Sequence, residues 1–348
     1  MKWYSRWSLV VVLVGSLAMM SCHNGGGGNN ADQPVGDKLS CLTGELKDFG
    51  IIGGKSVDAS AWVAKSTVAL LQFGDSKDET SLCTGTLIDT NIVLTAAHCV
   101  DKAAKNPTEK LKVIFATNLS CEAKQKVLTQ SIVAASEVII HPAWKSKGAD
   151  LQSSQRGDIA LVRLSTVAPS PYVAMPLSES FIAPESTGRV LVAGYGNTVD
   201  YSAQMDTIRL NAVVLQPLKP STLAETQSAF RDFLKKEKKS DGTRSLTDEQ
   251  VEKFVGSYFA MGPDKEMLFV DQSEGKGVCS GDSGGPSFMV RSGQTYVTGV
   301  ASYVLNLTGS RKCHKVGAHT STYFHKSWIE KNFTYLKTGA SRKTTPFQ

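Results

Sequence analysis

The stretch Cys279-Ser280-Gly281-Asp282-Ser283-Gly284-Gly285-Pro286 is the most informative part of this 348-residue sequence. Glycines lie on both sides of Ser283, and glycine accepts backbone angles of a tight turn that other residues avoid. In such a turn the Ser283 hydroxyl can reach a carbonyl carbon while the amides of Gly281 and Ser283 point at the oxyanion that develops. A surface turn alone needs no such sequence, so the stretch predicts a nucleophilic serine with an oxyanion hole.

Two earlier segments supply the groups that a nucleophilic serine needs. Thr95-Ala96-Ala97-His98-Cys99 closes an apolar strand, and His98 is a candidate for the general base that such a serine needs. Asp158 directly precedes an alternating strand at 159–164 and would hold the His98 tautomer. A single histidine is usually structural, and an aspartate before a strand is an ordinary turn residue. Their combination with residues 279–286 is what favours catalysis.

These motifs, in the order His, Asp, Ser, resemble the trypsin and chymotrypsin family of serine proteases from Ile51 to about Phe333. The resemblance implies a triad of His98, Asp158 and Ser283. It also implies an endopeptidase that hydrolyses peptide bonds through an acyl-enzyme, and we expect no metal and no cofactor, since no metal-ligand spacing occurs.

The spacing of apolar segments predicts an all-β fold. The family resemblance implies that this fold consists of two packed antiparallel six-stranded β-barrels with a C-terminal helix. The protease domain is expected at residues 51–335, followed by a tail at 336–348. Expected strands lie at 68–73, 85–88, 92–95, 112–116, 159–164, 190–193, 208–215, 286–290 and 296–303.

A helical insertion is expected at about 221–262. Thr247 and Gln250 form a capping box before apolar residues at helical spacing, and Thr222 with Glu225 is expected to open an earlier helix. The insertion is interpreted as a helical hairpin packed on a barrel. A role in substrate access or partner docking is the alternative.

The amino-terminal residues resemble an export signal. Lys2 and Arg6 precede an apolar run at 9–20 that is too short to span a bilayer comfortably, so residues 1–21 are assigned to a signal peptide. The run ends at Cys22 in a sequence similar to a bacterial lipobox, although Met20 replaces the usual small residue. An ordinary signal peptide is the alternative. Residues 22–50 then form a polar, glycine-rich tether and propeptide.

Seven cysteines in an exported chain indicate an oxidising compartment and one unpaired thiol. Lipidation of Cys22 would leave an even number. The family resemblance implies disulfides Cys83–Cys99 and Cys279–Cys313, which leaves Cys41 with Cys121 as a third pair.

The resemblance also implies activation by cleavage. Ile51-Ile52-Gly53-Gly54 is similar to the new amino terminus of an activated zymogen, whose amine pairs with the aspartate before the nucleophile, here Asp282. Residues 193–196 match the segment that lines this insertion. A precursor cleaved between Gly50 and Ile51 is therefore expected.

Four residues correspond to the family's substrate-binding positions. Gly277 lies six residues before Ser283, at the floor of the pocket for the side chain preceding the scissile bond, and the lack of a carboxylate there disfavours Lys and Arg. Ser302 and Val304 belong to the strand that binds the substrate backbone, and Gly317 to the remaining wall. Val304 replaces a glycine that would admit large side chains, so an elastase-like preference for small or medium aliphatic residues is expected.

The net charge of +6 is dispersed, and a nucleic-acid partner is not expected. Expected partners are protein or peptide substrates and protease inhibitors, with membrane contact only through a lipid anchor and a monomeric state. The protein would be an outer-membrane or cell-surface lipoprotein, or secreted if the anchor is absent. Two alternatives are a non-catalytic, protease-like binding or adhesion protein and a surface attachment protein that uses its inserted helices.

Overall fold

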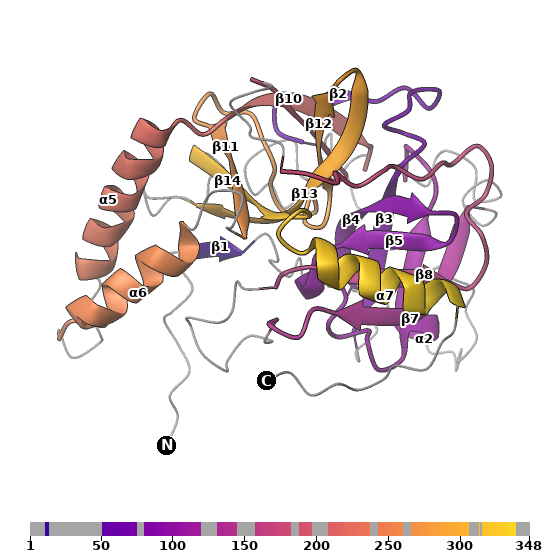
Figure 1. Ribbon diagram of the computed structural model, residues 1–348, viewed down its shortest axis with the longest axis horizontal. Coiled ribbons are helices and arrows are strands. Elements are labelled where there is room, and N and C mark those ends of the chain that lie inside the picture. The colour runs from indigo at the N-terminus through magenta and orange to yellow at the C-terminus, as the bar shows by residue number, and fades with distance from the viewer. Residues whose placement is uncertain are drawn as a thin grey trace, which may run out of the picture.

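The computed structural model describes residues 11–13, 51–74, 80–119, 131–144, 157–181, 188–196, 208–236, 243–259, 266–305, 313 and 315–338. Most of these residues form two β-barrels that lie side by side (Figure 1). The predicted all-β, two-barrel fold is confirmed. Predictions that concern Cys22, Cys41, Cys121 and Gly50 fall outside the described residues.

The first barrel closes on itself through six strands. Every residue of β3 from Thr67 to Gln72 is buried, as expected for a strand between the barrel interior and a covered outer face. The barrel order is β3 (Thr67–Phe73), β4 (Thr80–Asp89), β5 (Ile92–Thr95), β8 (Ala160–Leu164), β7 (Ile132–Ile140) and β6 (Leu111–Ile114). A short helix, α2 (Pro107–Lys110), leads into β6.

The second barrel is closed by pairing of its last two strands, β13 and β14. Its order is β13 (Gln294–Leu305), β12 (Pro286–Arg291), β9 (Val190–Gly194), β10 (Asn211–Pro217), β11 (Met267–Gln272) and β14 (Lys315–Ser321). Strand β2 (Lys55–Ser56) adds to β10. The two barrels meet at the segments that carry the three catalytic motifs of the sequence.

Strand β1 (Val11–Leu13) lies in the apolar run assigned to the export signal. It pairs antiparallel with Tyr303–Leu305 of β13, outside the barrel. A valine-rich segment readily adds to an open strand edge. Export itself stays a prediction. Among the described residues, no helix combines the length and apolar character needed to cross a bilayer.

The predicted insertion consists of helices α5 (Pro220–Lys236) and α6 (Asp248–Tyr258). The capping box is confirmed: Thr247 Oγ1 accepts from the Gln250 amide at 3.2 Å, and Gln250 Oε1 accepts from the Thr247 amide at 2.8 Å. The predicted start at Thr222 is wrong, because α5 begins at Pro220, whose ring sets the first helical φ without needing an N–H.

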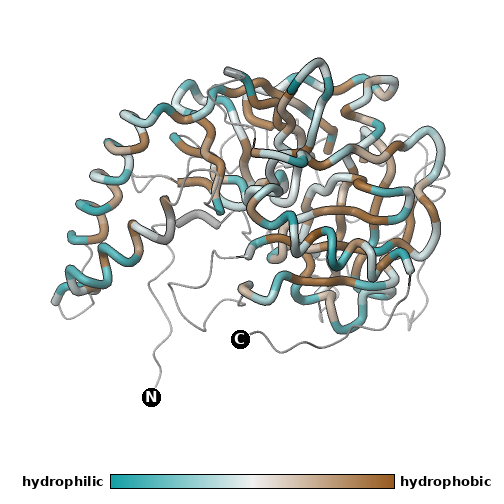
Figure 2. Tube along the Cα trace, in the orientation of Figure 1, coloured by the Kyte–Doolittle hydropathy of each residue, from teal (hydrophilic) through white to brown (hydrophobic). Residues whose placement is uncertain are grey.

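The two inserted helices pack on the second barrel through aromatic side chains. The Phe259 ring lies 5.6 Å from Phe230 of α5 and 5.8 Å from Phe269 of β11, measured between ring centroids. Figure 2 shows hydrophobic and hydrophilic residues alternating along both helices, as expected for helices with one buried face. The hairpin therefore extends the core of the barrel.

The C-terminal helix α7 (Lys326–Thr338) follows β14 of the second barrel and crosses back over the first barrel (Figure 1). Ile329 and Leu336 are buried in the core of that barrel. Lys337 pairs with Asp89 at 2.6 Å. The helix thus runs past the expected domain boundary at residue 335 and ties the two barrels together.

Candidate active site

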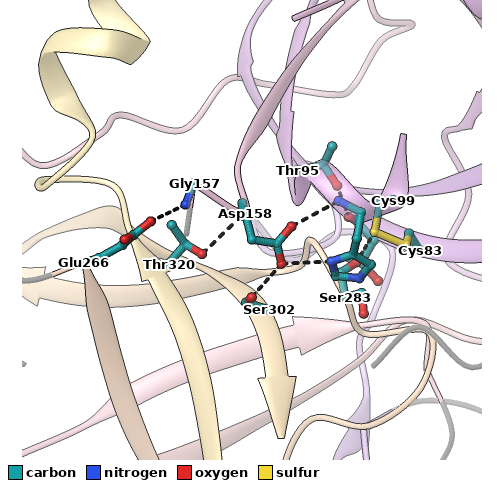
Figure 3. A network of polar contacts seen from close by, with 11 residues as sticks. Cys83, Thr95, Cys99, Gly157, Asp158, Glu266, Ser283, Ser302 and Thr320 are labelled. Atoms are coloured by element: carbon teal, nitrogen blue, oxygen red, sulfur yellow. Dashed lines mark hydrogen bonds and ion pairs between the residues drawn. A yellow bond between two sulfur atoms is a disulfide. The ribbon is translucent and has the colours of Figure 1, made fainter. Parts of the chain in front are cut away.

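His98 and Asp158 are brought together by the pairing of β5 with β8, in which Thr95 faces Ala160. His98 lies in a short 3-10 turn directly after β5. Its Nδ1 is 2.8 Å from Asp158 Oδ2, and its amide donates to Asp158 Oδ1 at 3.0 Å (Figure 3). The Asp158 side chain is fully buried, whereas that of His98 is 11% exposed. The carboxylate thus fixes both the ring and the backbone of the histidine.

The second barrel supplies two further contacts to Asp158. Ser302 Oγ donates to Asp158 Oδ2 at 2.5 Å, and Thr320 Oγ1 donates to the Asp158 carbonyl at 3.1 Å (Figure 3). Ser302 was predicted as a substrate-binding residue. Its side chain is turned to the aspartate, and the predicted contact between the backbone of this strand and a substrate stays a prediction.

A cluster of titratable side chains lies behind Asp158. Glu266 accepts a hydrogen bond from the Gly157 amide and pairs with His325 Nε2 at 3.1 Å. The His141 ring stacks edge-on against His325, with centroids 4.5 Å apart. Burial, with the neighbouring His325, lowers the pKa of His141 to about 4. The cluster anchors the residue before Asp158, and sequence reasoning missed it because its members are far apart in the chain.

The turn that carries Ser283 is held between the two barrels by Thr84 of β4. The Thr84 amide donates to the Ser283 carbonyl at 2.7 Å, and Thr84 Oγ1 donates to the Gly281 carbonyl at 2.9 Å. On the other side, the Gly284 amide donates to the Ala301 carbonyl at 2.7 Å. Gly284 has φ +80°, and a Cβ there would overlap Thr95 Oγ1. The sequence pointed to the glycines but not to Thr84.

The predicted disulfide Cys83–Cys99 is present and joins β4 to the turn bearing His98, with Cα atoms 6.0 Å apart. Closing a loop of this size stabilises a fold by about 3 kcal/mol in the chain-entropy model. The two cysteines and His98 lie close enough to hold a metal ion. Both sulfurs are bonded to one another, however, so neither is a thiolate ligand.

Asp282 directly precedes Ser283 in the nucleophile turn and is fully buried. Its carboxylate accepts from the amides of Cys279 and Gly196, each at 2.8 Å. A Cβ on Gly194 or Gly196 would overlap this carboxylate, so residues 193–196 line the site as expected. In the part of the chain that the structure describes, no cationic side chain pairs with it. Burial raises the pKa of Asp282 to about 7.

Ile51 and Ile52 belong to the same buried apolar cluster as Cys279, three residues before Asp282. Ile51 is fully buried, and Ile52 exchanges two backbone hydrogen bonds with Gly277, at 3.1 and 3.0 Å. The Ile51 nitrogen is an amide here and carries no charge.

The uncleaved chain is expected to lose stability as the pH rises from about 4 to about 7. The native state binds the Asp282 proton more tightly than the unfolded state does, so the free energy of unfolding falls across this window, by about 4 kcal/mol at most. Asp282→Asn should remove this part of the pH dependence. Urea unfolding at both ends of the window, in a Ser283→Ala background that prevents self-cleavage, measures the difference. An equal pH dependence in the two proteins would contradict the prediction.

The predicted substrate-binding residues also converge. Val304 of β13 faces Gly317 of β14 across the sheet, and the predicted disulfide Cys279–Cys313 is present with Cα atoms 5.4 Å apart. Gly277 and Gly317 contact the same side chain, that of Gln272 at the end of β11. Gln272 was not predicted as a site residue, because a strand-end glutamine carries no sequence signal of its contacts.

The fold of two closed barrels, with His98, Asp158 and the Ser283 turn at their junction, is the architecture of a serine endopeptidase. The trypsin family model matches residues 51–228 and 239–329, and the chain belongs to this family.

Curated relatives agree with this assignment. The chain is 27% identical over 285 residues to chymotrypsin-like elastase family member 1 of Macaca fascicularis, covering 81% of this chain and 88% of that protein. It is 26% identical over 276 residues to serine protease 28 of Mus musculus, covering 76% and 87%. It is 25% identical over 300 residues to the phenoloxidase-activating enzyme of Bombyx mori, covering 80% and 60%.

Proposed function

We propose that this serine endopeptidase works through Ser283, His98 and Asp158. The hydrogen bond from His98 Nδ1 to Asp158 Oδ2 at 2.8 Å carries the proposal, since a neutral imidazole that donates from Nδ1 has Nε2 as the nitrogen that can accept a proton. Ser283 Oγ attacks the substrate carbonyl while His98 takes its proton. His98 then protonates the leaving amine, and water releases the acyl group by the reverse sequence.

The oxyanion that forms in each step is stabilised by the amides of Gly281 and Ser283. Thr84 supports this arrangement, because it binds the carbonyls of both residues and so holds the peptide groups that directly follow the two amides. Asp158 in turn is fixed by Ser302 and by the backbone of His98. Donors that are already oriented need no reorganisation during the reaction, which is the main source of their effect.

The substrate backbone is proposed to pair with the edge of β13 at residues 302–304. Support comes from β1, which pairs antiparallel with Tyr303–Leu305 at the same edge. An extended peptide would take the place of β1 and make equivalent backbone hydrogen bonds. This mode of binding places the scissile bond by backbone contacts and leaves side-chain selection to Gly277, Val304 and Gly317.

A preference for small or medium aliphatic residues before the scissile bond is proposed. Val304 is fully buried opposite Gly317, so its two methyl groups take up width that a glycine would leave open. Gly277 offers no charge to a buried Lys or Arg. The resemblance to chymotrypsin-like elastases supports the same preference.

A peptide library that varies the residue before the scissile bond tests this specificity. The enzyme is expected to favour Ala and Val, and Val304→Gly should raise kcat/KM for Leu relative to Ala by about tenfold, because removal of the valine side chain makes room for a wider apolar group. Faster cleavage after Arg than after Ala in the wild-type enzyme would overturn the proposed specificity while leaving the triad untouched.

The chain is further proposed to be an exported zymogen activated by cleavage before Ile51, and a lipoprotein anchored through Cys22. The buried carboxylate of Asp282, which has no cationic partner among the described residues, supports activation by cleavage, and export rests on the sequence alone. The lipid anchor likewise rests on the sequence alone. Fractionation of cells that make the full chain tests it, since recovery of the protein only in the soluble fraction would rule out the anchor.

A further inference from the structure

We propose that Gln272 is the residue that sets the depth of the primary specificity site, so that it selects side chains by length while Val304 selects them by width. This inference rests on the proposed placement of the substrate side chain between Gly277, Val304 and Gly317. It adds a residue from a different strand, β11, whose side chain lies across the floor of that site.

The position of Gln272 follows from what surrounds the two glycines. A Cβ on Gly277 would overlap the Cδ, Cγ and Nε2 atoms of Gln272, and a Cβ on Gly317 would overlap its Oε1. The carboxamide thus lies between the two glycines, in the space that side chains at these positions would otherwise fill. Gln272 itself is fully buried.

The carboxamide is held there by hydrogen bonds to both sides of the site. Gln272 Nε2 donates to the carbonyls of Cys313 at 2.8 Å and Val278 at 3.2 Å, and its Oε1 accepts from the Val278 amide at 3.0 Å. Both protons of the amide are used, so moving the group aside would leave buried backbone groups unsatisfied. Gln272 is therefore a fixed floor and not a side chain that yields to a substrate.

A neutral floor has two consequences for the substrate. A straight apolar side chain can extend only until it meets the carboxamide, and each methylene beyond that point must displace a fully hydrogen-bonded group. A lysine or arginine side chain would end against an amide with no negative charge, and its buried cation would be unpaired. Depth and charge selection thus come from the same residue, in addition to the missing carboxylate at Gly277.

The test uses a length series of peptides that differ only before the scissile bond, with Ala, norvaline, norleucine or Leu. Four proteins are compared: wild type, Val304→Gly, Gln272→Ala and the double variant, each normalised by titration of its reactive serine. Val304→Gly should improve Leu more than norleucine, because it adds width. Adding Gln272→Ala should raise kcat/KM for norleucine relative to Ala by about tenfold or more over Val304→Gly alone, the scale of one methylene in an apolar pocket.

Gln272→Met is the matched variant, since it keeps the length of the side chain and loses the amide. It should retain the wild-type length limit, which separates the steric role from a general loosening of the site. Identical length profiles for Val304→Gly and the double variant would overturn the inference. If Gln272→Ala does not fold, Val304→Gly decides alone: an equal gain on norleucine and Leu would show that no floor exists at Gln272. A wild-type enzyme that prefers Arg would instead refute the proposed specificity.

Discussion

Replacement of Ser283 by alanine is expected to abolish peptide hydrolysis, with a fall in kcat of about six orders of magnitude. No acyl-enzyme can form without the hydroxyl, and His98 and Asp158 then have no nucleophile to activate. The loss should appear in kcat and not in KM, because the residues proposed to bind the substrate remain in place. Steady-state kinetics with a peptide that has Ala directly before the scissile bond gives both kcat and KM.

Ser280→Ala is the matched control for this experiment. Ser280 belongs to the same turn, and its buried Oγ has no hydrogen-bond partner among the described residues. A fluorophosphonate probe should therefore label wild type and Ser280→Ala but not Ser283→Ala, with similar melting temperatures for all three. Labelling of Ser283→Ala, or hydrolysis by it at a rate near that of wild type, would place the nucleophile elsewhere and reopen the non-catalytic interpretation of this motif.

The motifs could be recognised in the sequence because each one places its chemistry within a few consecutive residues. The turn at 279–286 and the capping box at Thr247 are of this kind, and the structure shows both features where they were expected. The strands predicted at 92–95 and 190–193 also agree closely with the observed strands β5 and β9, since both are short apolar runs bounded by turn residues.

The features that sequence reasoning missed depend on contacts between distant segments. Strands β7, β11 and β14 were not predicted from the sequence. Strand β7 mixes small and charged residues because only part of it faces the core. Thr84, Glu266 and Gln272 have ordinary sequence contexts. Their roles appear only when β4 meets the nucleophile turn, Glu266 meets Gly157, and β11 meets Gly277.

Cleavage that makes Ile51 the first residue is expected to raise kcat/KM by about two to three orders of magnitude over the uncleaved chain. Cleavage creates an α-ammonium group on Ile51, which packs in the same buried cluster as Cys279. Among the described residues, Asp282 is buried without a positive partner. An uncompensated buried charge costs about 3–5 kcal/mol relative to a paired one. Pairing would hold Asp282 ionised and order the adjacent Gly281 amide, which the proposed oxyanion hole requires.

For this test, residues 47–50 are replaced by a recognition sequence for an added protease that leaves Ile51 as the first residue, and kcat/KM is measured before and after cleavage. A second protein, cleaved so that it begins at Ile52, is the matched control, because its amine is one residue too short to occupy the position of Ile51. Amino-terminal sequencing confirms each product, and the first should read Ile-Ile-Gly-Gly. Asp282→Asn in the correctly cleaved protein should return kcat/KM to the level of the uncleaved chain, because the amide cannot neutralise the ammonium. The prediction is contradicted if the uncleaved chain, or the protein that begins at Ile52, is as active as the protein that begins at Ile51. In that case no ion pair controls the site, and the buried carboxylate of Asp282 serves only to bind the amides of Cys279 and Gly196.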